Sequence, residues 1–245
     1  MKTAGKSDTG LVRQANQDAY HITQFSGKIT LGAVCDGMGG PKGGEVAAET
    51  ALRIIVDQIS SSYRPDMSAR SAKNMLKSAV FAANITVHDM AKAAPSLDGM
   101  GTTVVIVYAA DGTAHIAHVG DSRVYLINSD KTEITQITKD HSIVQNMLES
   151  GQLTREEAKH HPRRNIITRA IGVGETVEMD YAEVPLSRND ILLLCTDGLS
   201  NHLDSDDILL IIRENEFSEI PEKLIELANK RGGSDNITAV LIENE

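Results

Sequence analysis

The chain has 245 residues, 41% hydrophobic and 24% charged, with a formal net charge of −10. This mix suits one large globular domain or two small ones, and the negative charge disfavours nucleic-acid binding through phosphate neutralisation. No apolar run reaches the ~18 residues of a membrane span, and Met1–Asp8 lacks the apolar stretch of a signal peptide, which predicts a cytoplasmic location.

The spacing of apolar residues predicts a pair of helices followed by a run of strands. The two amphipathic helices are expected at Glu45–Ser60 and Ser71–Lys92. Short strands follow at Thr103–Tyr108, Ala114–Val119, Val124–Ile127 and Glu133–Ile137. Between the first two strands, Asp111-Gly112 is a typical hairpin turn.

The second half again alternates pairs of helices with strands. Helices are expected at Ser142–Ser150 and Thr154–His160, joined at Gly151, and at Asp204–Glu214 and Ile220–Lys230, the last one ended by Gly232. Strands are expected at Met179–Val184, Ile191–Cys195 and Ile237–Ile242. Because helices come in pairs and strands in runs, we expect a layered α+β domain with mainly antiparallel sheets.

Acidic turns border several of these apolar strands. Asp36 and Asp197 each come just after a strand-like run, Asp121 follows another by two residues, and Asp235 precedes the last strand. Carboxylates at strand ends sit on rigid elements, and several aimed at one point suit hard divalent cations, which prefer oxygen ligands. Neighbouring glycines leave room for close approach to an ion. The pattern indicates metal-dependent hydrolysis.

Eight short motifs follow one another over nearly the whole chain. They are Arg13-Gln-Ala-Asn-Gln-Asp18, Asp36-Gly-Met-Gly-Gly40, Gly101-Thr-Thr103, Gly120-Asp-Ser-Arg123, Asp140-His-Ser142, Thr168-Arg-Ala-Ile-Gly172, Cys195-Thr-Asp-Gly-Leu199 and Ser234-Asp-Asn-Ile-Thr238. Each motif alone is weak. Together and in this order they resemble the metal-dependent protein serine/threonine phosphatases of type 2C, in their bacterial form.

The resemblance implies one catalytic domain over residues 1–245. Its fold is expected to be a four-layer α/β/β/α sandwich, with two stacked, mainly antiparallel sheets flanked by helices. Two Mg²⁺ or Mn²⁺ ions are expected in a cleft at one end of the sandwich. Carried over onto this sequence, the resemblance implies that Asp36 is the carboxylate that bridges both metals and that Gly37 offers a backbone carbonyl ligand. Asp197 and Asp235 are then ligands of the second metal, and Asp18 holds metal-bound water. Asp121, together with Asp197, makes a weaker third site. Arg13 resembles the guanidinium that grips the substrate phosphate.

The residue types agree with hydrolysis of a phosphate monoester. Two nearby cations lower the pKa of a bridging water, so that a hydroxide can attack in line while the ions screen the anion. A fork-shaped guanidinium such as that of Arg13 can take two phosphate oxygens at once. Neither Cys35 nor Cys195 has an arginine at the spacing that a cysteine phosphatase requires. Both cysteines instead suit small buried side chains at strand ends.

Each site residue also has a structural interpretation. Asp36 and Asp197 lie in Asp-Gly pairs, which are most often plain turns, and Asp235 suits a turn cap. Asp121 suits a hairpin residue that pairs with Arg123. Arg13 and Asp18 suit surface charges in the N-terminal segment. The structure decides whether these side chains converge.

Two positions differ from the wider family. Animal and plant members commonly carry a histidine after the first Asp-Gly pair, often proposed as the acid for the leaving alkoxide, whereas this chain has Met38. A metal-bound water or one of His141, His160 and His161 is left as the candidate acid. Gln17 stands where many eukaryotic members have glutamate.

The segment 143–171 resembles the mobile flap of bacterial members. Gly151 provides a hinge, and positive charge comes from Arg155, Arg163, Arg164 and Arg169. This segment either docks the phosphoprotein near the phosphate or is a solvated helical pair.

We therefore expect a monomeric phosphatase that acts on phosphoserine and phosphothreonine in phosphoproteins. The resemblance implies that it opposes a eukaryotic-like serine/threonine kinase, including dephosphorylation of that kinase. A sporulation or stress-type phosphatase of one anti-sigma-factor antagonist remains an alternative, as does a non-catalytic phosphatase-fold binding module. The charge of −10 disfavours a metal-dependent nuclease.

Overall fold

The computed structural model describes residues 1–26, 28–159 and 161–245. Its strands are β1 (Lys2–Asp8), β2 (Asp18–Ser26), β3 (Ile29–Met38), β4 (Gly101–Thr102), β5 (Val104–Ala110), β6 (Thr113–Val119), β7 (Arg123–Ile127), β8 (Ile134–Gln136), β9 (Asp180–Pro185), β10 (Ile191–Cys195) and β11 (Ile237–Glu243). Its helices are α1 (Gly40–Ser62), α2 (Ala69–Ala93), the 3₁₀ turn η1 (Pro95–Leu97), α3 (Ile143–Glu149), α4 (Arg155–Lys159), α5 (Asp197–Ser200), α6 (Ser205–Glu214) and α7 (Ile220–Lys230).

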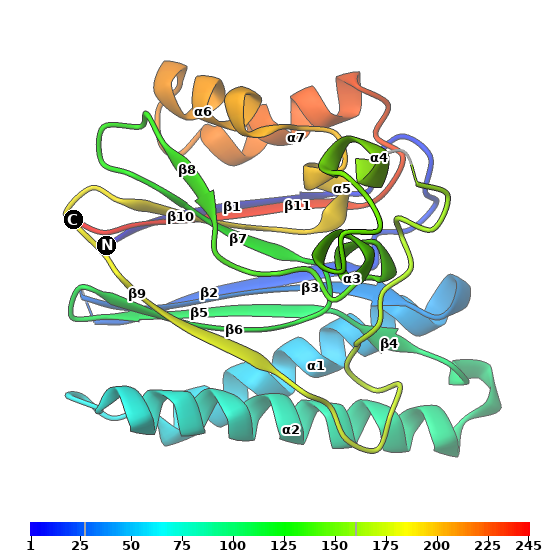
Figure 1. Ribbon diagram of the computed structural model, residues 1–245. Coiled ribbons are helices and arrows are strands. Elements are labelled where there is room, and N and C mark those ends of the chain that lie inside the picture. Colours follow the sequence, from blue (N-terminus) through cyan, green and yellow to red (C-terminus); the bar gives the residue numbers. More distant parts are fainter. Residues whose placement is uncertain (27, 160) are drawn as a thin grey trace.

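These elements form four layers, as Figure 1 shows. One sheet has the strand order β1-β11-β10-β7-β8 and the other β2-β3-β5-β6-β9, with β4 paired to β3, and the pairings are antiparallel. Helices α6 and α7 cover the first sheet, and α1 and α2 cover the second. The predicted α/β/β/α sandwich is confirmed.

Strand β3 is buried on both faces, which fixes its end firmly in the molecule. Leu31, Ala33 and Cys35 pack toward α1 and α2, while Val34 points into the apolar layer between the sheets. Side chains alternate across a strand, so a run buried on both sides reads as continuously apolar. Cys35 and Cys195 are free and buried, as expected for small core side chains.

The predicted elements are present with shifted ends, and the predicted hairpin is confirmed. Asp111 and Gly112 have φ of 49° and 75° between β5 and β6, as a tight hairpin turn requires. The predicted end of the helix at His160 lies outside the described residues. Helix α1 begins at Gly40, five residues before the predicted start at Glu45, because the Gly-Pro-Lys-Gly-Gly stretch that reads as a loop forms its first turn.

The sequence did not predict β1, β2, β4 or α5. Strand β1, Lys-Thr-Ala-Gly-Lys-Ser-Asp, is polar and lies at the edge of its sheet, so it lacks the apolar pattern that marks a buried strand. Among the described residues, no helix is long and apolar enough to cross a membrane.

Candidate metal centre

Four carboxylates from both sheets meet at one end of the sandwich. Asp18 opens β2 and lies directly opposite Asp36, near the end of β3. In the other sheet, the end of β10 pairs with the start of β11, so Asp197 follows one strand beside the turn in which Asp235 precedes the next. In addition to burial, the charges of Asp18, Asp197 and Asp235 all act on the carboxyl group of Asp36 and raise its pKa, as expected for side chains that lie close together. The strand-end carboxylates predicted from the sequence therefore converge.

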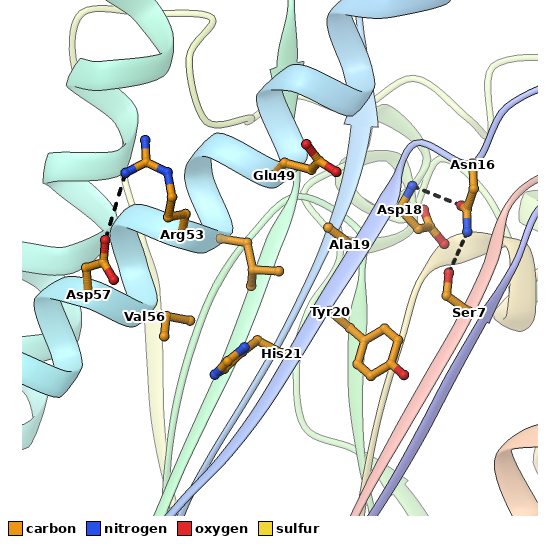
Figure 2. Close-up of a pocket in the computed structure, with 11 residues that line it drawn as sticks. Ser7, Asn16, Asp18, Ala19, Tyr20, His21, Glu49, Arg53, Val56 and Asp57 are labelled. Atoms are coloured by element: carbon orange, nitrogen blue, oxygen red, sulfur yellow. Dashed lines mark hydrogen bonds and ion pairs between the residues drawn. The ribbon is translucent and has the colours of Figure 1, made fainter.

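Asp18 is clamped by hydroxyl groups of the opposite sheet. Its Oδ2 accepts hydrogen bonds from Oγ1 of Thr196 at 2.9 Å and Oγ1 of Thr238 at 2.7 Å. On its own side, the Asp18 N–H donates to Oδ1 of Asn16 at 3.1 Å, and Asn16 Nδ2 donates to Ser7 Oγ at 2.8 Å (Figure 2). These contacts fix one carboxylate oxygen and tie the two sheets together at the site.

Figure 2 also shows the surface behind Asp18, where a pocket lies between β2 and α1. Its helix side carries Glu49, Arg53 and Asp57, and Arg53 pairs with Asp57 at 3.8 Å. An exposed pair of this kind at i,i+4 contributes little to stability. The charges of this pocket are those of an ordinary solvated helix face.

Two glycines allow the backbone to close tightly around the carboxylates. A Cβ on Gly37 would lie 2.0 Å from the carbonyl oxygen of Gly44 in α1, and a Cβ on Gly198 would lie 2.0 Å from the carbonyl oxygen of Asn236. Neither space can hold a methyl group. The end of β3 is thereby pressed against α1, and α5 against the turn that carries Asp235.

The side chain of Asn236 organises the N-terminal loop over the site. Its Nδ2 donates to the carbonyl oxygens of Thr9 and Ala15, both at 2.9 Å, and its Oδ1 accepts from the Gln17 N–H at 2.8 Å. The loop held in this way carries Arg13, whose Nη2 contacts Oδ2 of Asp235 at 2.8 Å. Arg13 is thus placed at the rim of the acidic cluster.

Burial and mutual repulsion raise the pKa values of the clustered carboxyls. Burial raises the pKa of Asp36, and repulsion from Asp18 and Asp197 adds to it. Burial raises the pKa of Asp18 to about 7, against the lowering effect of its threonine hydrogen bonds. The pKa of Asp121 is raised to about 7 by burial and then by Asp197, and that of Asp197 by burial and then by Asp235.

The donor set fits hard divalent cations. Oδ1 of Asp18 and Oδ1 of Asp197 are buried and have no hydrogen-bond partner within the described part of the chain. Burying a carboxylate oxygen without a partner is costly, and a bound cation relieves both that cost and the repulsion among the acids. All the ligand atoms offered are oxygens, the preference of Mg²⁺ and Mn²⁺.

Arg123 pairs with Asp140 rather than with Asp121. Its Nε and Nη2 donate to the Asp140 carboxylate at 3.0 and 2.7 Å, and its Nη1 donates to Tyr125 Oη at 3.0 Å. The interpretation of Asp121 as the partner of Arg123 is therefore not supported. Asp121 follows Gly120 at the end of β6, and it lies close enough to Asp197 for the charge of Asp197 to add to the rise in its pKa.

A second group of potential ligands consists of His118, His141 and Asp180, whose donor atoms lie within 4.8 Å of one another. A cation already occupies this group, because Nη1 of Arg169 contacts Nε2 of His141 at 3.1 Å and Oδ1 of Asp180 at 2.8 Å. His141 Nδ1 accepts from the Gly120 N–H at 3.1 Å. The group is better described as a hydrogen-bonded network that braces the Asp121 turn than as a metal site.

A broad groove adjoins the acidic cluster and the predicted flap. Asp121, Asp197 and Asn201 line it from the cluster side, and Arg155 and Arg164 line it from the segment 143–171. Figure 1 shows α3 and α4 of this segment at the end of the sandwich where α5 lies.

The remaining flap residues lie in different surroundings. Arg169 is engaged by Asp180 and His141, so its charge is largely compensated. Nδ1 of the half-buried His161 accepts from the Arg163 N–H at 3.2 Å. His160 lies outside the described residues.

Sequence reasoning missed the residues that hold the predicted ligands. Thr196 and Thr238 fix Asp18, Asn236 holds the Arg13 loop, and Asn201 donates to Asp197 Oδ2 at 3.1 Å. The available signal was position, since three of these four residues lie within the motifs that contain Asp197 and Asp235.

Comparisons with known proteins give one consistent result. A family model described as protein phosphatase 2C matches residues 11–242. The serine/threonine phosphatase stp of Listeria innocua is 37% identical over 244 residues, covering 99% of this chain and 96% of the relative. The crystal structure of the serine/threonine phosphatase Stp1 from Staphylococcus aureus has a TM-score of 0.93 at 34% identity and covers 100% of this chain and 95% of that one. The catalytic domain of the serine/threonine protein phosphatase PstP, in complex with two manganese ions, has a TM-score of 0.84 at 35% identity and covers 99% of this chain and 97% of that one.

Proposed function

The chain belongs to the protein phosphatase 2C family of metal-dependent serine/threonine phosphatases, and we propose that its acidic cluster holds two Mg²⁺ or Mn²⁺ ions. Asp36 would bridge both ions and Gly37 would offer its carbonyl oxygen. Asp197 and Asp235 would hold the second ion, and Asp18 would bind water of the first. The observation that carries this proposal is the pair of buried, unpartnered oxygens on Asp18 and Asp197.

We extend the proposal to a third, weaker metal site at Asp121 and Asp197. Its support is the burial of Asp121 beside the same cluster, which raises the pKa of its carboxyl. The complex of PstP with two manganese ions supports two sites in that relative.

The bound ions would supply Lewis acidity and a nucleophilic water of lowered pKa. The chain's own residues then have separate tasks. Arg13 binds the phosphate, since its exposed guanidinium at the rim of the cluster can present two N–H groups to two oxygens. Thr196 and Thr238 hold Oδ2 of Asp18 still, and Oδ1 would be left to accept a hydrogen bond from water at the ions. The acid cluster repels an unaccompanied phosphate, so binding requires the cations.

The proton for the leaving alkoxide comes from a group other than Met38, which has none to give. His141 is a weak candidate, because both of its ring nitrogens are engaged, by Gly120 and by Arg169 with Asp180. Burial also lowers the pKa of His141. We propose a positioning role for His141, and leave His160, His161 and a metal-bound water as the candidate acids to be tested.

For substrates we propose phosphoproteins bound along the groove, with residues 143–171 acting as a flap. Arg155 and Arg164 line this groove together with Asp121 and Asp197, which supports docking over a merely solvated helical pair. The named serine/threonine phosphatases of Listeria and Staphylococcus support a role opposite a serine/threonine kinase. A regulatory phosphatase with one anti-sigma antagonist as substrate shares this site chemistry and remains the alternative.

We further propose that residues 1–245 act as one catalytic domain, as a monomer in the cytoplasm. The proposal of one catalytic domain is supported by the match of residues 11–242 to a single family model.

Phosphate release from a phosphothreonine peptide tests the proposed function. Wild-type protein and Asp36→Asn are compared with Mn²⁺ or Mg²⁺ and with EDTA, after both are shown to unfold cooperatively on heating. We expect release by the wild type with metal, and loss of at least about a hundredfold with EDTA or in the variant. Folded wild type that releases no phosphate with either metal would favour the non-catalytic binding module.

A further inference from the structure

Two large apolar side chains are exposed immediately beside Arg13. Leu11 is 68% exposed and Val12 is 66% exposed, in the loop that joins β1 to β2. Single exposed apolar residues are common on protein surfaces, so exposure alone carries no conclusion. What singles out this pair is its fixed position next to the residue that would bind phosphate.

The loop is anchored firmly to the turn that carries Asp235. The Leu11 N–H donates to the Gly233 carbonyl oxygen at 2.8 Å, and the Gly10 N–H donates to Asp8 Oδ1 at 2.8 Å. Gly10 has a φ of 77°, and a Cβ there would lie 2.2 Å from the Asp235 carbonyl oxygen. The apolar pair is therefore presented from a backbone with little freedom, which lowers the entropic cost of docking against it.

The location of the pair relative to the site is equally definite. The Leu11 side chain lies over Gly233, because a Cβ built on Gly233 would be 3.0 Å from Leu11 Cγ. Gly233 is two residues before Asp235, which contacts Arg13 at 2.8 Å. Leu11 and Val12 directly precede Arg13 in the chain. Because an extended chain advances about 3.3 Å per residue, the residues next to the phosphoresidue of a substrate held at Arg13 are within reach of the pair.

We propose that Leu11 and Val12 form a docking surface for a large apolar side chain that flanks the phosphoresidue of the substrate. This inference rests on the proposed phosphatase function and adds a substrate preference to it. The groove that adjoins the cluster is lined by charged groups such as Arg155 and Arg164. The Leu11–Val12 surface would bind apolar residues of the substrate, and the groove with Arg155 and Arg164 would bind charged ones.

Two phosphothreonine peptides test the inference, identical except that one has leucine and the other serine at the two positions on each side of the phosphoresidue. Wild type is compared with the double variant Leu11→Ser, Val12→Ser. The control is Leu210→Ser, which removes an apolar side chain that is 52% exposed on α6. Steady-state kinetics give kcat and KM for each peptide.

We expect wild type to prefer the leucine peptide about tenfold in kcat/KM, mainly through KM, because docking removes apolar surface from water. The double variant should lose this preference and leave the serine peptide unchanged, while Leu210→Ser keeps the preference. The double variant Leu11→Met, Val12→Ile, which keeps two large apolar side chains, should keep the preference for the leucine peptide.

Equal kinetics of wild type on the two peptides would overturn the docking surface and leave the phosphatase function intact. An equal loss of activity on both peptides in the double variant would overturn it as well, because it would show a general defect of the loop. A wild type that hydrolyses neither peptide with metal present would instead refute the proposed function, and the docking surface with it.

Discussion

Gly37→Ala should damage both the stability and the activity of the protein, although it adds one methyl group. The new Cβ would lie 2.0 Å from the Gly44 carbonyl oxygen and 2.7 Å from that of Gln17, and both obstacles are backbone. The first oxygen must retreat by about 1 Å to reach even the shortest contacts that Cβ atoms make. Either the end of β3, which carries Asp36, or the start of α1 has to move.

The expected cost is about 3 kcal/mol, at the upper end for overpacking, because neither neighbour can rotate away. For a chain of this size that lowers Tm by roughly 6–12 °C. The matched control is Gly32→Ala in the same strand, where the Cβ would first meet the Cδ1 tip of Ile242 at 2.9 Å. A flexible tip can turn aside, and the unfolded chain loses entropy, so a change within about 1 kcal/mol is expected.

Urea unfolding gives the free energies of both variants, and Mn²⁺ titration followed by calorimetry gives their metal affinity. We expect Gly37→Ala to lose stability and to bind Mn²⁺ more weakly, while Gly32→Ala keeps both. Equal stability of the two variants would refute the argument that the end of β3 is held against α1 by close backbone contact.

Three further outcomes are expected. Mn²⁺ at about a hundred times its Kd should stabilise the protein by about 2.7 kcal/mol, because the ion binds the folded cluster and not the unfolded chain. Tm should rise by roughly 5–10 °C and fall again when EDTA is added. An unchanged Tm would contradict this. Asp140→Ala should lower the free energy of unfolding by about 3 kcal/mol, because it leaves the half-buried guanidinium of Arg123 without its partner. Adding Arg123→Met should recover part of this stability. Additive losses in the double variant would show that the two side chains are not coupled. Arg164→Ser should raise KM for a phosphoprotein several-fold and leave KM for a small aryl phosphate unchanged. The control is Arg163→Ser, because Arg163 is outside the described lining of the groove. Equal effects of Arg164→Ser on both substrates would argue against docking.

The convergence of the acidic side chains could be predicted from the sequence because each of the three acids lies beside a recognisable apolar strand. Asp36, Asp197 and Asp235 border runs that are buried in the structure, and a buried strand fixes the direction of the residue at its end. The layered fold followed from the same runs, since paired helices and grouped strands limit the ways in which apolar faces can be covered.

The parts that could not be predicted depend on contacts between distant residues. The motifs named Asp18 but not the contacts that hold it opposite Asp36. Thr238, which donates to its carboxylate, is 220 residues away in sequence. The Arg123–Asp140 pair is similar, because spacing offered only Asp121 as an alternative partner of Arg123 and gave no sign of Asp140. Hydrogen-bond partners across two sheets leave no periodic signal.

Anomalous diffraction at the manganese edge, from crystals grown with Mn²⁺, tests the proposed centre most directly. We expect two strong peaks among Asp36, Asp197 and Asp235, a weaker one near Asp121, and no peak between His118 and His141. Peaks at the histidine pair with none beside Asp36 would contradict the assignment of the acidic cluster as the metal centre.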